Sequence, residues 1–208
     1  MTDDEIFAAI TDERCRLADQ VAAFSDEQWA TPSLCAAWTC REVLAHLVSP
    51  LVTPKWVFAL EMAKARGDFT KANLAVTART DRRCGTALPH ILRAQAGRRF
   101  TPPGHGPQAP LTDIVVHGRD ILRPLGLSLP IAPLRQRAVL DFLTGPQGGM
   151  ARRLTGFRWA ATDLDWETGT GPTLVGTADA LMLTISGRRV AVDELSGTGT
   201  DELRARLA

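Results

Sequence analysis

The sequence predicts a two-part protein in which a helical region precedes a smaller region that mixes helices and strands. Apolar residues recur at helical spacing through much of residues 1–126, whereas turn-rich segments and short apolar runs characterise residues 151–208. Residues 127–150 hold one further helical pattern and a run of glycines, so we expect them to connect the two parts. The predicted fold class is therefore α + (α+β), with domains at 1–126 and 151–208.

Length and composition are those of an ordinary globular protein and exclude several classes of function. The chain has 208 residues, of which 45% are hydrophobic and 23% charged, and its formal net charge is +1. A chain so close to neutral lacks the basic surplus of a nucleic-acid-binding protein. No stretch reaches the roughly 20 apolar residues that span a bilayer, and the acidic N-terminus is unlike a signal peptide. We expect a cytoplasmic protein that binds neither nucleic acid nor membrane.

Two capping boxes mark helix starts in the first part. Thr2-Asp3-Asp4-Glu5 precedes apolar residues at helical spacing and predicts a helix over residues 3–24. Thr39-Cys40-Arg41-Glu42 opens a second predicted helix. Residues 25–38, which lie between the two helices, are predicted to form a structured loop.

The rest of the helical part is less regular. Residues 55–98 predict one long helix or two shorter ones, with a break near 67–68 or at Gly85. Residues 111–125 predict a helix that Gly126 closes, because glycine is favoured just after a helix end. About four helices are therefore expected in the first part, which suits a helix bundle.

The second part is predicted to be a small α+β unit. Residues 157–162 and 173–176 are predicted strands, and residues 163–172 between them are rich in turn residues. Helices are predicted over residues 135–143, 178–186 and 201–207.

The cysteines are interpreted as thiols. The chain has four of them, Cys15, Cys35, Cys40 and Cys84. No CxxC pair occurs, so neither a zinc ribbon nor a thioredoxin-type motif is indicated. In a cytosolic chain such cysteines are mostly reduced packing groups. A nucleophilic role for Cys35 is an alternative, because it lies in an irregular segment beside other candidate residues.

One helix carries an acid and an imidazole on the same face. Asp113 and His117 are four residues apart, and Ile114 and Ile121 share their face, so this face is expected to point inward. Burying a lone carboxylate or imidazole is costly, so both groups need partners. A divalent metal is one such partner, since zinc binds imidazole nitrogen and carboxylate oxygen.

A third candidate ligand lies on the second predicted helix. His46 shares the apolar face of Val43 and Leu47 there. If that face meets the Asp113–His117 face, two histidines and one carboxylate come together, the ligand pattern of catalytic zinc with an open fourth position. The same set suits non-haem iron. The alternative without metal is a helix ion pair beside a core histidine.

The remaining ring side chains near these motifs are assigned packing roles. His90 and His105 are interpreted as structural or exposed, although His105 lies in a Pro-Gly loop from which it could reach a site. Trp29 and Trp38 flank the loop before the second helix. We expect both to pack over the start of that helix and not to form a ligand cage.

Other motifs give weaker signals. Ser186-Gly187-Arg188-Arg189 is interpreted as an exposed basic turn, with anion binding as the alternative. Gly169-Thr170-Gly171 lacks the strand–helix setting of a dinucleotide fingerprint, and no Walker A, HExxH or GxSxG motif occurs.

Two long segments carry a resemblance to a known family. They are residues 29–47 (WATPSLCAAWTCREVLAHL) and residues 113–121 (DIVVHGRDI). Shorter matches follow in the same order in the tail, at residues 161–166, 171–172, 187–188 and 193–197. Together they resemble the mycothiol-dependent maleylpyruvate isomerase family of the DinB-like superfamily.

This resemblance implies a fold and a metal site. The fold is a DinB-like four-helix bundle followed by a small sterol-carrier-like α+β domain. The metal ligands are His46, Asp113 and His117, and the isomerase pattern has glutamate at the position of Asp113. Zinc is the expected metal, with nickel or iron as alternatives. Mycothiol is implied as the thiol co-substrate.

The implied activity is thiol addition or transfer to an electrophilic small molecule, or its cis–trans isomerisation. Arg188 would bind a substrate carboxylate, and Asp120 would either hydrogen-bond a ligand histidine or pair with Arg119 or Arg123. The alternatives are a metal-binding protein without turnover and a small-molecule carrier. A carrier needs an apolar tunnel, for which residues 150–208 look too short. Monomer and homodimer are both left open.

Overall fold

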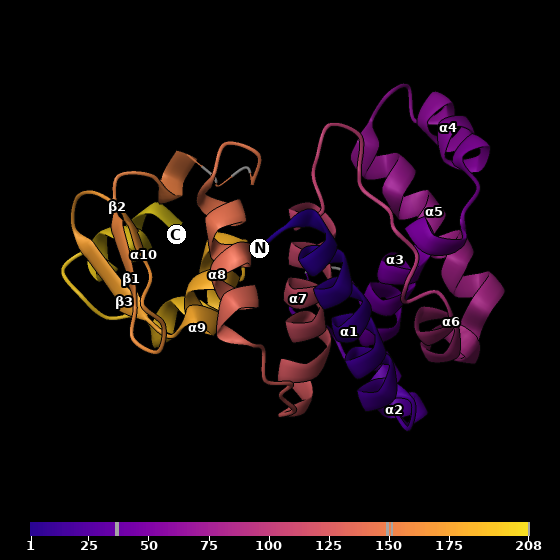
Figure 1. Ribbon diagram of the computed structural model, residues 1–208, viewed down its shortest axis with the longest axis horizontal. Helices are drawn as coiled ribbons and strands as arrows, with labels where there is room; N and C mark the ends of the chain where they lie inside the picture. Colours follow the sequence, from indigo (N-terminus) through magenta and orange to yellow (C-terminus); the bar gives the residue numbers. More distant parts are fainter. Residues whose placement is uncertain (36–37, 149, 151, 208) are drawn as a thin grey trace. The chain divides into compact units, whose positions relative to one another are not determined.

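The computed structural model describes residues 1–35, 38–148, 150 and 152–207 (Figure 1). The chain forms two compact units. The first, which we call the helical unit, comprises residues 4–101 and 113–129. The second, which we call the mixed unit, comprises residues 1–3, 102–112 and 130–208.

The helical unit is built from consecutive helices joined by short connections. They are α1 (Asp3–Val21), α2 (Asp26–Ala30), α3 (Cys40–Val52), α4 (Lys55–Lys64), α5 (Phe69–Cys84), α6 (Leu88–Ala94) and α7 (Gln108–Leu122), with the 3₁₀ turns η1 (Gly85–Ala87) and η2 (Arg123–Leu125). The division between the two units passes through α7, between Thr112 and Asp113.

Capping boxes begin α2 and α3. The Thr39 hydroxyl accepts a hydrogen bond from the backbone N–H of Glu42, and the Glu42 carboxylate accepts one from the N–H of Thr39, so the predicted capping box of α3 is confirmed. Ser25 and Gln28 form a second capping box, which begins α2. This short helix lies inside the segment predicted as a loop.

Residues 55–98 hold three helices where the sequence predicted one or two. The chain breaks at both anticipated places, because Gly67 (φ 84°) and Gly85 (φ 49°) adopt positive φ values that disfavour other residues. Gly126 has φ 67°, so the predicted glycine stop after α7 and η2 is confirmed.

Helix α3 lies at the centre of the helical unit. It packs against α2, α5 and α6, and α4 packs against α5. Val43, Leu44, Val48 and Leu51 of α3 are fully buried, and such burial of apolar surface is the main stabilising term in folding. His46 lies on this same buried helix, so the packing of α3 holds the His46 side chain in a fixed orientation.

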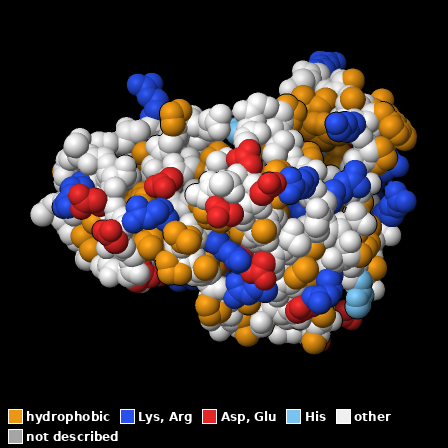
Figure 2. Space-filling view, in the orientation of Figure 1, with side chains coloured by type: hydrophobic (Ala, Val, Ile, Leu, Met, Phe, Trp, Pro, Cys, Tyr) orange, Lys and Arg blue, Asp and Glu red, His pale blue; other side chains and the backbone are white. Residues whose placement is uncertain are grey.

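The α4–α5 pair also carries apolar side chains on its surface. They are Trp56, Leu60, Phe69 and Leu74. Figure 2 shows hydrophobic surface near the end of the helical unit where α4 and α5 lie. No single helix in the described part of the chain is long and apolar enough to cross a membrane, although α3 and α4, bent by 119°, match that length and composition together.

The mixed unit combines helices with a small sheet. Its elements are α8 (Pro133–Thr144), η3 (Arg152–Leu154), β1 (Arg158–Ala161), β2 (Glu167–Gly169), β3 (Thr173–Gly176), α9 (Ala178–Ile185), η4 (Arg189–Glu194) and α10 (Thr200–Leu207). Within the described residues the sheet has the order β2-β1-β3, with β1 antiparallel to β2 and parallel to β3. The sequence missed β2, which lies in the segment interpreted as turns.

The core of the mixed unit lies between the sheet and its helices. Trp159 of β1 is 1% exposed, and α9 packs against β1, β3, α8 and η4. The Trp166 indole N–H donates a 2.7 Å hydrogen bond to the Asp141 carboxylate of α8. The described part of the protein is thus mostly helical with one small sheet. This agrees with the predicted combination of a helical part and an α+β part.

Candidate metal centre

The three side chains predicted as metal ligands come together in the helical unit. His46 lies on α3, and Asp113 and His117 lie one turn apart on α7. The Oδ1 atom of Asp113 is 3.5 Å from His46 Nε2 and 3.4 Å from His117 Nε2. All three ligand atoms lie within 4.8 Å of one another. We call these residues the His–Asp–His cluster.

Local contacts hold α3 against the end of α7. The Cys40 thiol, at the start of α3, donates a 3.5 Å hydrogen bond to the Ile121 carbonyl. The loop before α3 is attached as well, because the Leu34 N–H donates a 3.1 Å hydrogen bond to the Asp120 carbonyl. These contacts connect residues about 80 positions apart in the chain, and they fix the two helices on which the cluster depends.

The spacing inside the cluster suits a metal better than direct hydrogen bonds. Protein N–H···O hydrogen bonds are usually about 2.7–3.2 Å long, so 3.4 and 3.5 Å are long for both imidazoles. Two ligands each about 2.1 Å from a tetrahedral zinc ion lie about 3.4 Å apart. The donor set, two neutral imidazoles and a carboxylate, is also one that zinc uses. The residues therefore fit a divalent metal with one position left for another ligand.

Neighbouring polar groups orient both imidazoles. His117 Nδ1 lies 2.8 Å from the Oδ2 atom of Asp120, whose side chain is fully buried, so His117 Nε2 faces Asp113. Carboxylates commonly accept the second N–H of a ligand histidine, and Asp120 can fix the His117 ring and its tautomer in this way. His46 Nδ1 lies 3.5 Å from the Nδ2 atom of the Asn73 side-chain amide on α5, which is a hydrogen-bond donor.

Charges within the cluster compensate one another. Desolvation opposes ionisation of Asp113, but the imidazoles of His46 and His117 hold the pKa of that carboxyl well below its usual range. Desolvation likewise opposes protonation of His117, yet the neighbouring carboxylates of Asp113 and Asp120 raise its pKa to about 9. In the metal-free protein, the proton on His117 thus balances the negative charge of the carboxylates, which a bound metal cation would otherwise balance.

One side of the cluster is open and another is covered by an indole. The Asp113 side chain is 39% exposed, which gives solvent access to the carboxylate. The Trp38 ring lies 5.2 Å from the His46 ring and 6.5 Å from the His117 ring. Trp38 was predicted to pack over the start of α3, and its ring lies against His46 of that helix, which also brings it beside the cluster. Trp29 packs on Phe24 instead, with ring centroids 5.0 Å apart.

A second group of potential ligands overlaps the first. Ligand atoms of Cys35, His117 and Asp120 also lie within 4.8 Å of one another. The 2.8 Å distance between His117 and Asp120 is, however, a hydrogen-bond length and shorter than the spacing of two ligands on one zinc ion. The His–Asp–His cluster is therefore the better candidate. All four cysteines are free thiols, as predicted.

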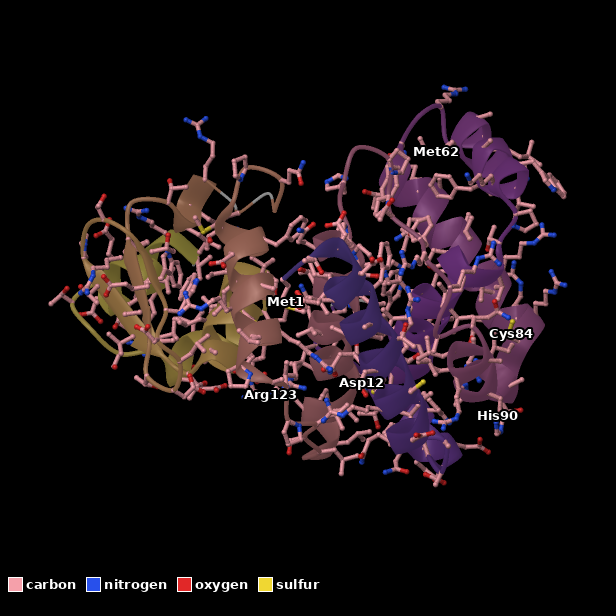
Figure 3. The ribbon with its side chains drawn as sticks, in the orientation of Figure 1. Met1, Asp12, Met62, Cys84, His90 and Arg123 are labelled. Carbon is pink, nitrogen blue, oxygen red and sulfur yellow. The ribbon has the colours of Figure 1, made fainter. Side chains whose placement is uncertain are left out.

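The other candidate residues lie elsewhere in the fold. Arg188 is part of the mixed unit, where its guanidinium donates a 2.6 Å hydrogen bond to the Ser186 carbonyl. His90 is exposed on α6 (Figure 3). His105 is exposed in the mixed unit, with Nδ1 3.1 Å from the Pro103 carbonyl oxygen.

Two residues of the site were missed by sequence reasoning. Asn73 lies in an alanine- and arginine-rich helix whose pattern gave no sign of a contact with His46. Trp38 was noticed but given a packing role. Both contacts depend on how distant elements pack, so spacing along the chain does not reveal them.

A helical unit with a three-ligand cluster of this kind defines a candidate metalloprotein. Residues 10–89 match the family model described as the mycothiol maleylpyruvate isomerase N-terminal domain. That match includes His46 and ends before Asp113. It confirms the resemblance to the mycothiol-dependent maleylpyruvate isomerase family that the sequence motifs indicate. No curated protein sequence matches the chain.

Two solved structures share the fold. One is a mycothiol-dependent maleylpyruvate isomerase, with a TM-score of 0.66 and 12% sequence identity. The other is a histidine-to-alanine mutant of a mycothiol-dependent maleylpyruvate isomerase, with a TM-score of 0.63 and 13% identity. Each comparison covers 96% of this chain and 94% of the other. At such identities the likeness shows the fold alone.

Proposed function

We propose that the chain is a metal-binding, mycothiol-dependent enzyme of maleylpyruvate-isomerase type, acting on an electrophilic small molecule. The observation that supports this most is the spacing of the His–Asp–His cluster, in which Asp113 Oδ1 lies 3.4 and 3.5 Å from two imidazole nitrogens. The match of residues 10–89 to the mycothiol isomerase domain supports the thiol requirement. The reaction is thiol addition or transfer, or cis–trans isomerisation.

The roles of the chain's own residues follow from their contacts. His46, Asp113 and His117 would hold the metal, Asp120 and Asn73 would keep the two imidazoles oriented, and Trp38 would shield one side of the site. Because His46, Asp113 and His117 come from the packed helices α3 and α7, the ligand geometry would exist before the metal binds.

The metal that we propose is zinc, with nickel or iron as alternatives that also accept these ligands. A bound zinc ion would lower the pKa of a contacting thiol and keep it as the nucleophilic thiolate. The open side of Asp113 is where such a thiol would enter. Aspartate is one methylene shorter than the glutamate of the isomerase pattern, so we expect the reacting groups to sit closer to α7.

The finer features of the fold are part of the same proposal. We assign residues 1–126 to a DinB-like four-helix bundle, 127–150 to a connecting segment and 151–208 to a sterol-carrier-like domain. Arg188 is proposed to bind a substrate carboxylate, since guanidinium groups bind carboxylates bidentately. The protein is proposed to act in the cytoplasm on small molecules, with neither nucleic acid nor membrane as a partner.

Metal analysis is the first test. Purified protein reconstituted with zinc is expected to hold about one ion per chain, whereas His46→Ala is expected to hold almost none, because it keeps only two of three ligands. His90→Ala is the matched control, since it removes an exposed histidine outside the cluster. Equal and near-zero metal in all three proteins would refute the metal site.

Turnover is the second test. Zinc-loaded protein is incubated with mycothiol and either maleylpyruvate or a panel of enones, and the rate is compared with the uncatalysed thiol reaction. We expect acceleration by the wild type and His90→Ala, and none by His46→Ala. Stoichiometric metal without acceleration of any of these reactions would favour a metal-binding protein that lacks turnover.

A further inference from the structure

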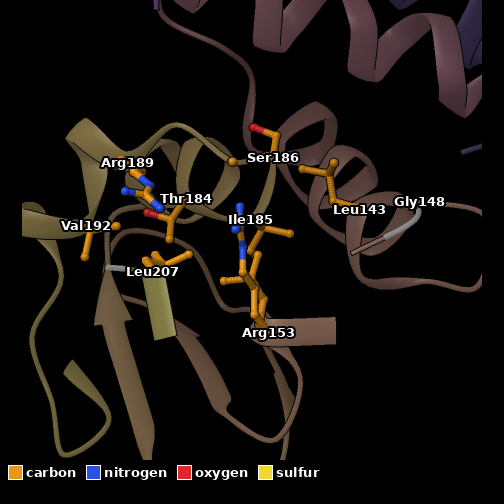
Figure 4. A pocket seen from close by; sticks show the side chains of 11 residues that line it. Leu143, Gly148, Arg153, Thr184, Ile185, Ser186, Arg189, Val192 and Leu207 are labelled. Carbon is orange, nitrogen blue, oxygen red and sulfur yellow. The ribbon is translucent and has the colours of Figure 1, made fainter. Parts of the chain in front are cut away.

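The mixed unit contains a cavity of about 360 Å³ (Figure 4). Its lining comes from η3, from α9 and η4 with the turn between them, and from the ends of α8 and α10. None of the lining residues belongs to the His–Asp–His cluster. The volume is within the range of small-molecule binding pockets, about 300–1,000 Å³.

One wall of the cavity contains an unsatisfied buried hydroxyl. Thr184 of α9 is 2% exposed, and its Oγ1 atom has no hydrogen-bond partner within the described part of the chain. A buried hydroxyl without a partner costs free energy, about 1–3 kcal/mol in mutational data. A threonine in a helix usually avoids this cost by bonding to a carbonyl of the preceding turn. The Thr184 hydroxyl has no such bond among the described residues, and Thr184 lines the cavity.

Two arginines complete the polar side. Arg153 comes from η3 and Arg189 from the start of η4, and Figure 4 shows Arg189 beside Thr184 and Arg153 beside Ile185. Neither guanidinium has a carboxylate partner among the described residues. Other arginines of the unit do have one: Arg158 pairs with Glu167, Arg204 with Asp193 and Arg206 with Glu202.

The rest of the lining is aliphatic. It consists mainly of the side chains of Leu143, Leu154, Ile185, Val192 and Leu207, all of which are buried. An inorganic anion would leave this surface without a partner, whereas a neutral apolar molecule would make no use of the two guanidiniums, which line the cavity and are exposed to solvent. The lining is therefore complementary to a molecule with an anionic end and an apolar body.

We propose that this cavity binds a small organic carboxylate with an apolar body of about eight carbon atoms. Arg153 and Arg189 would donate charge-assisted hydrogen bonds to the carboxylate, and the Thr184 hydroxyl would donate a third. The aliphatic residues would enclose the hydrocarbon. The proposal does not depend on the metal or on the thiol reaction, because it uses no residue of the His–Asp–His cluster.

Calorimetric titration of the full-length protein tests this proposal with three probes. Octanoate carries both features, 1-octanol lacks the charge, and inorganic phosphate lacks the apolar body. We expect octanoate to bind with a Kd below about 1 mM, and each of the other two at least 10-fold more weakly. Equal affinity for octanoate and 1-octanol, or for octanoate and phosphate, would overturn the proposal.

Variants connect the binding to this cavity. Arg153→Gln and Arg189→Gln should each weaken octanoate binding about 10-fold, since each removes one charge-assisted interaction. Arg204→Gln is the matched control: it removes the same charge from the same unit but lies on the paired surface. If Arg204→Gln weakens binding as much as the cavity variants, the effect is one of net charge and the proposal fails.

A fourth variant separates this site from the proposed enzyme. His46→Ala should bind octanoate with unchanged affinity even though it is expected to lose the metal. Loss of octanoate binding in His46→Ala would contradict the independence of the cavity. If the wild-type protein takes up no zinc and still binds octanoate, the cavity is supported and only the proposed function is refuted.

Discussion

The two units of the protein gather polar groups in opposite ways. In the helical unit, Asp113 faces two imidazoles, and the second nitrogen of each imidazole has its own neighbour in Asp120 or Asn73. In the mixed unit, two arginines and the buried Thr184 line a cavity, and neither guanidinium has a carboxylate partner among the described residues.

The difference indicates what each site is built to receive. A network that contains its own anion and orients its ring nitrogens is complementary to a cation. A cavity that holds donors and no acceptor carboxylate is complementary to an anion.

The stability of the metal-free protein should depend on the protonation of His117. Its pKa of about 9 lies above the ordinary unfolded value near 6.5, so the protonated form stabilises the fold. This contribution is complete below about pH 6.5 and is lost as the pH rises through 9. Asp113, with its lowered pKa, stays ionised throughout that window. The free energy of unfolding should therefore fall by up to about 3 kcal/mol between pH 6.5 and 9.5.

Urea denaturation of metal-free protein at several pH values measures this fall, and NMR titration of the His117 ring measures the pKa itself. His117→Gln is the control, and its stability should be nearly flat over the same range. A wild-type profile as flat as that of the variant would show that the cluster does not store a proton.

Removing the charge of Asp120 should weaken metal binding without removing a ligand. Asp120→Asn keeps an oxygen near His117 Nδ1 but loses the carboxylate charge, so the zinc affinity should fall 10- to 100-fold. Competition with a chelating dye gives the affinity. Asp19→Asn, which alters an exposed ion pair with Arg93, should leave it unchanged. Equal affinities in wild type and Asp120→Asn would mean that His117 needs no such orientation.

The smallest effect is expected in the mixed unit. Thr184→Val replaces the unpaired hydroxyl with a methyl group of similar size, so the ligand-free protein should gain about 1 kcal/mol of stability. The same variant should bind octanoate about threefold more weakly, because one donor is lost. Thermal unfolding and calorimetry provide the two readouts. A variant that is less stable than the wild type would show that Thr184 already has a partner.

The sequence predicted the members of the His–Asp–His cluster because their signals are local. Asp113 and His117 lie one turn apart, and the Thr39 capping box places His46 on an apolar helix face. It also predicted where most helices lie, since glycines such as Gly85 and Gly126 end them through positive φ values. The interpretation as a metal site also required the helix face of His46 to meet the face of Asp113 and His117. The periodicity of apolar residues does not ensure that these two faces meet.

What the sequence did not predict depends on long-range packing. Strand β2 is three residues long and lies among turn residues, so it forms only because β1 offers it hydrogen bonds. The Ser25 capping box begins a helix of five residues, too short to show a periodic pattern. The basic turn at 186–189 was interpreted as exposed, and Arg189 is indeed exposed, but only the fold shows that it also borders a cavity with Arg153.

The thiol of Cys40 offers a direct way to observe when α3 and α7 separate. Burial raises its pKa to about 11, and its side chain is 0% exposed, so alkylating reagents should not reach it in the folded protein. Cys15, Cys35 and Cys84 are partly exposed and should react first. The labelling rate of Cys40, followed by mass spectrometry, would then report each transient opening of the helix pair that carries the cluster.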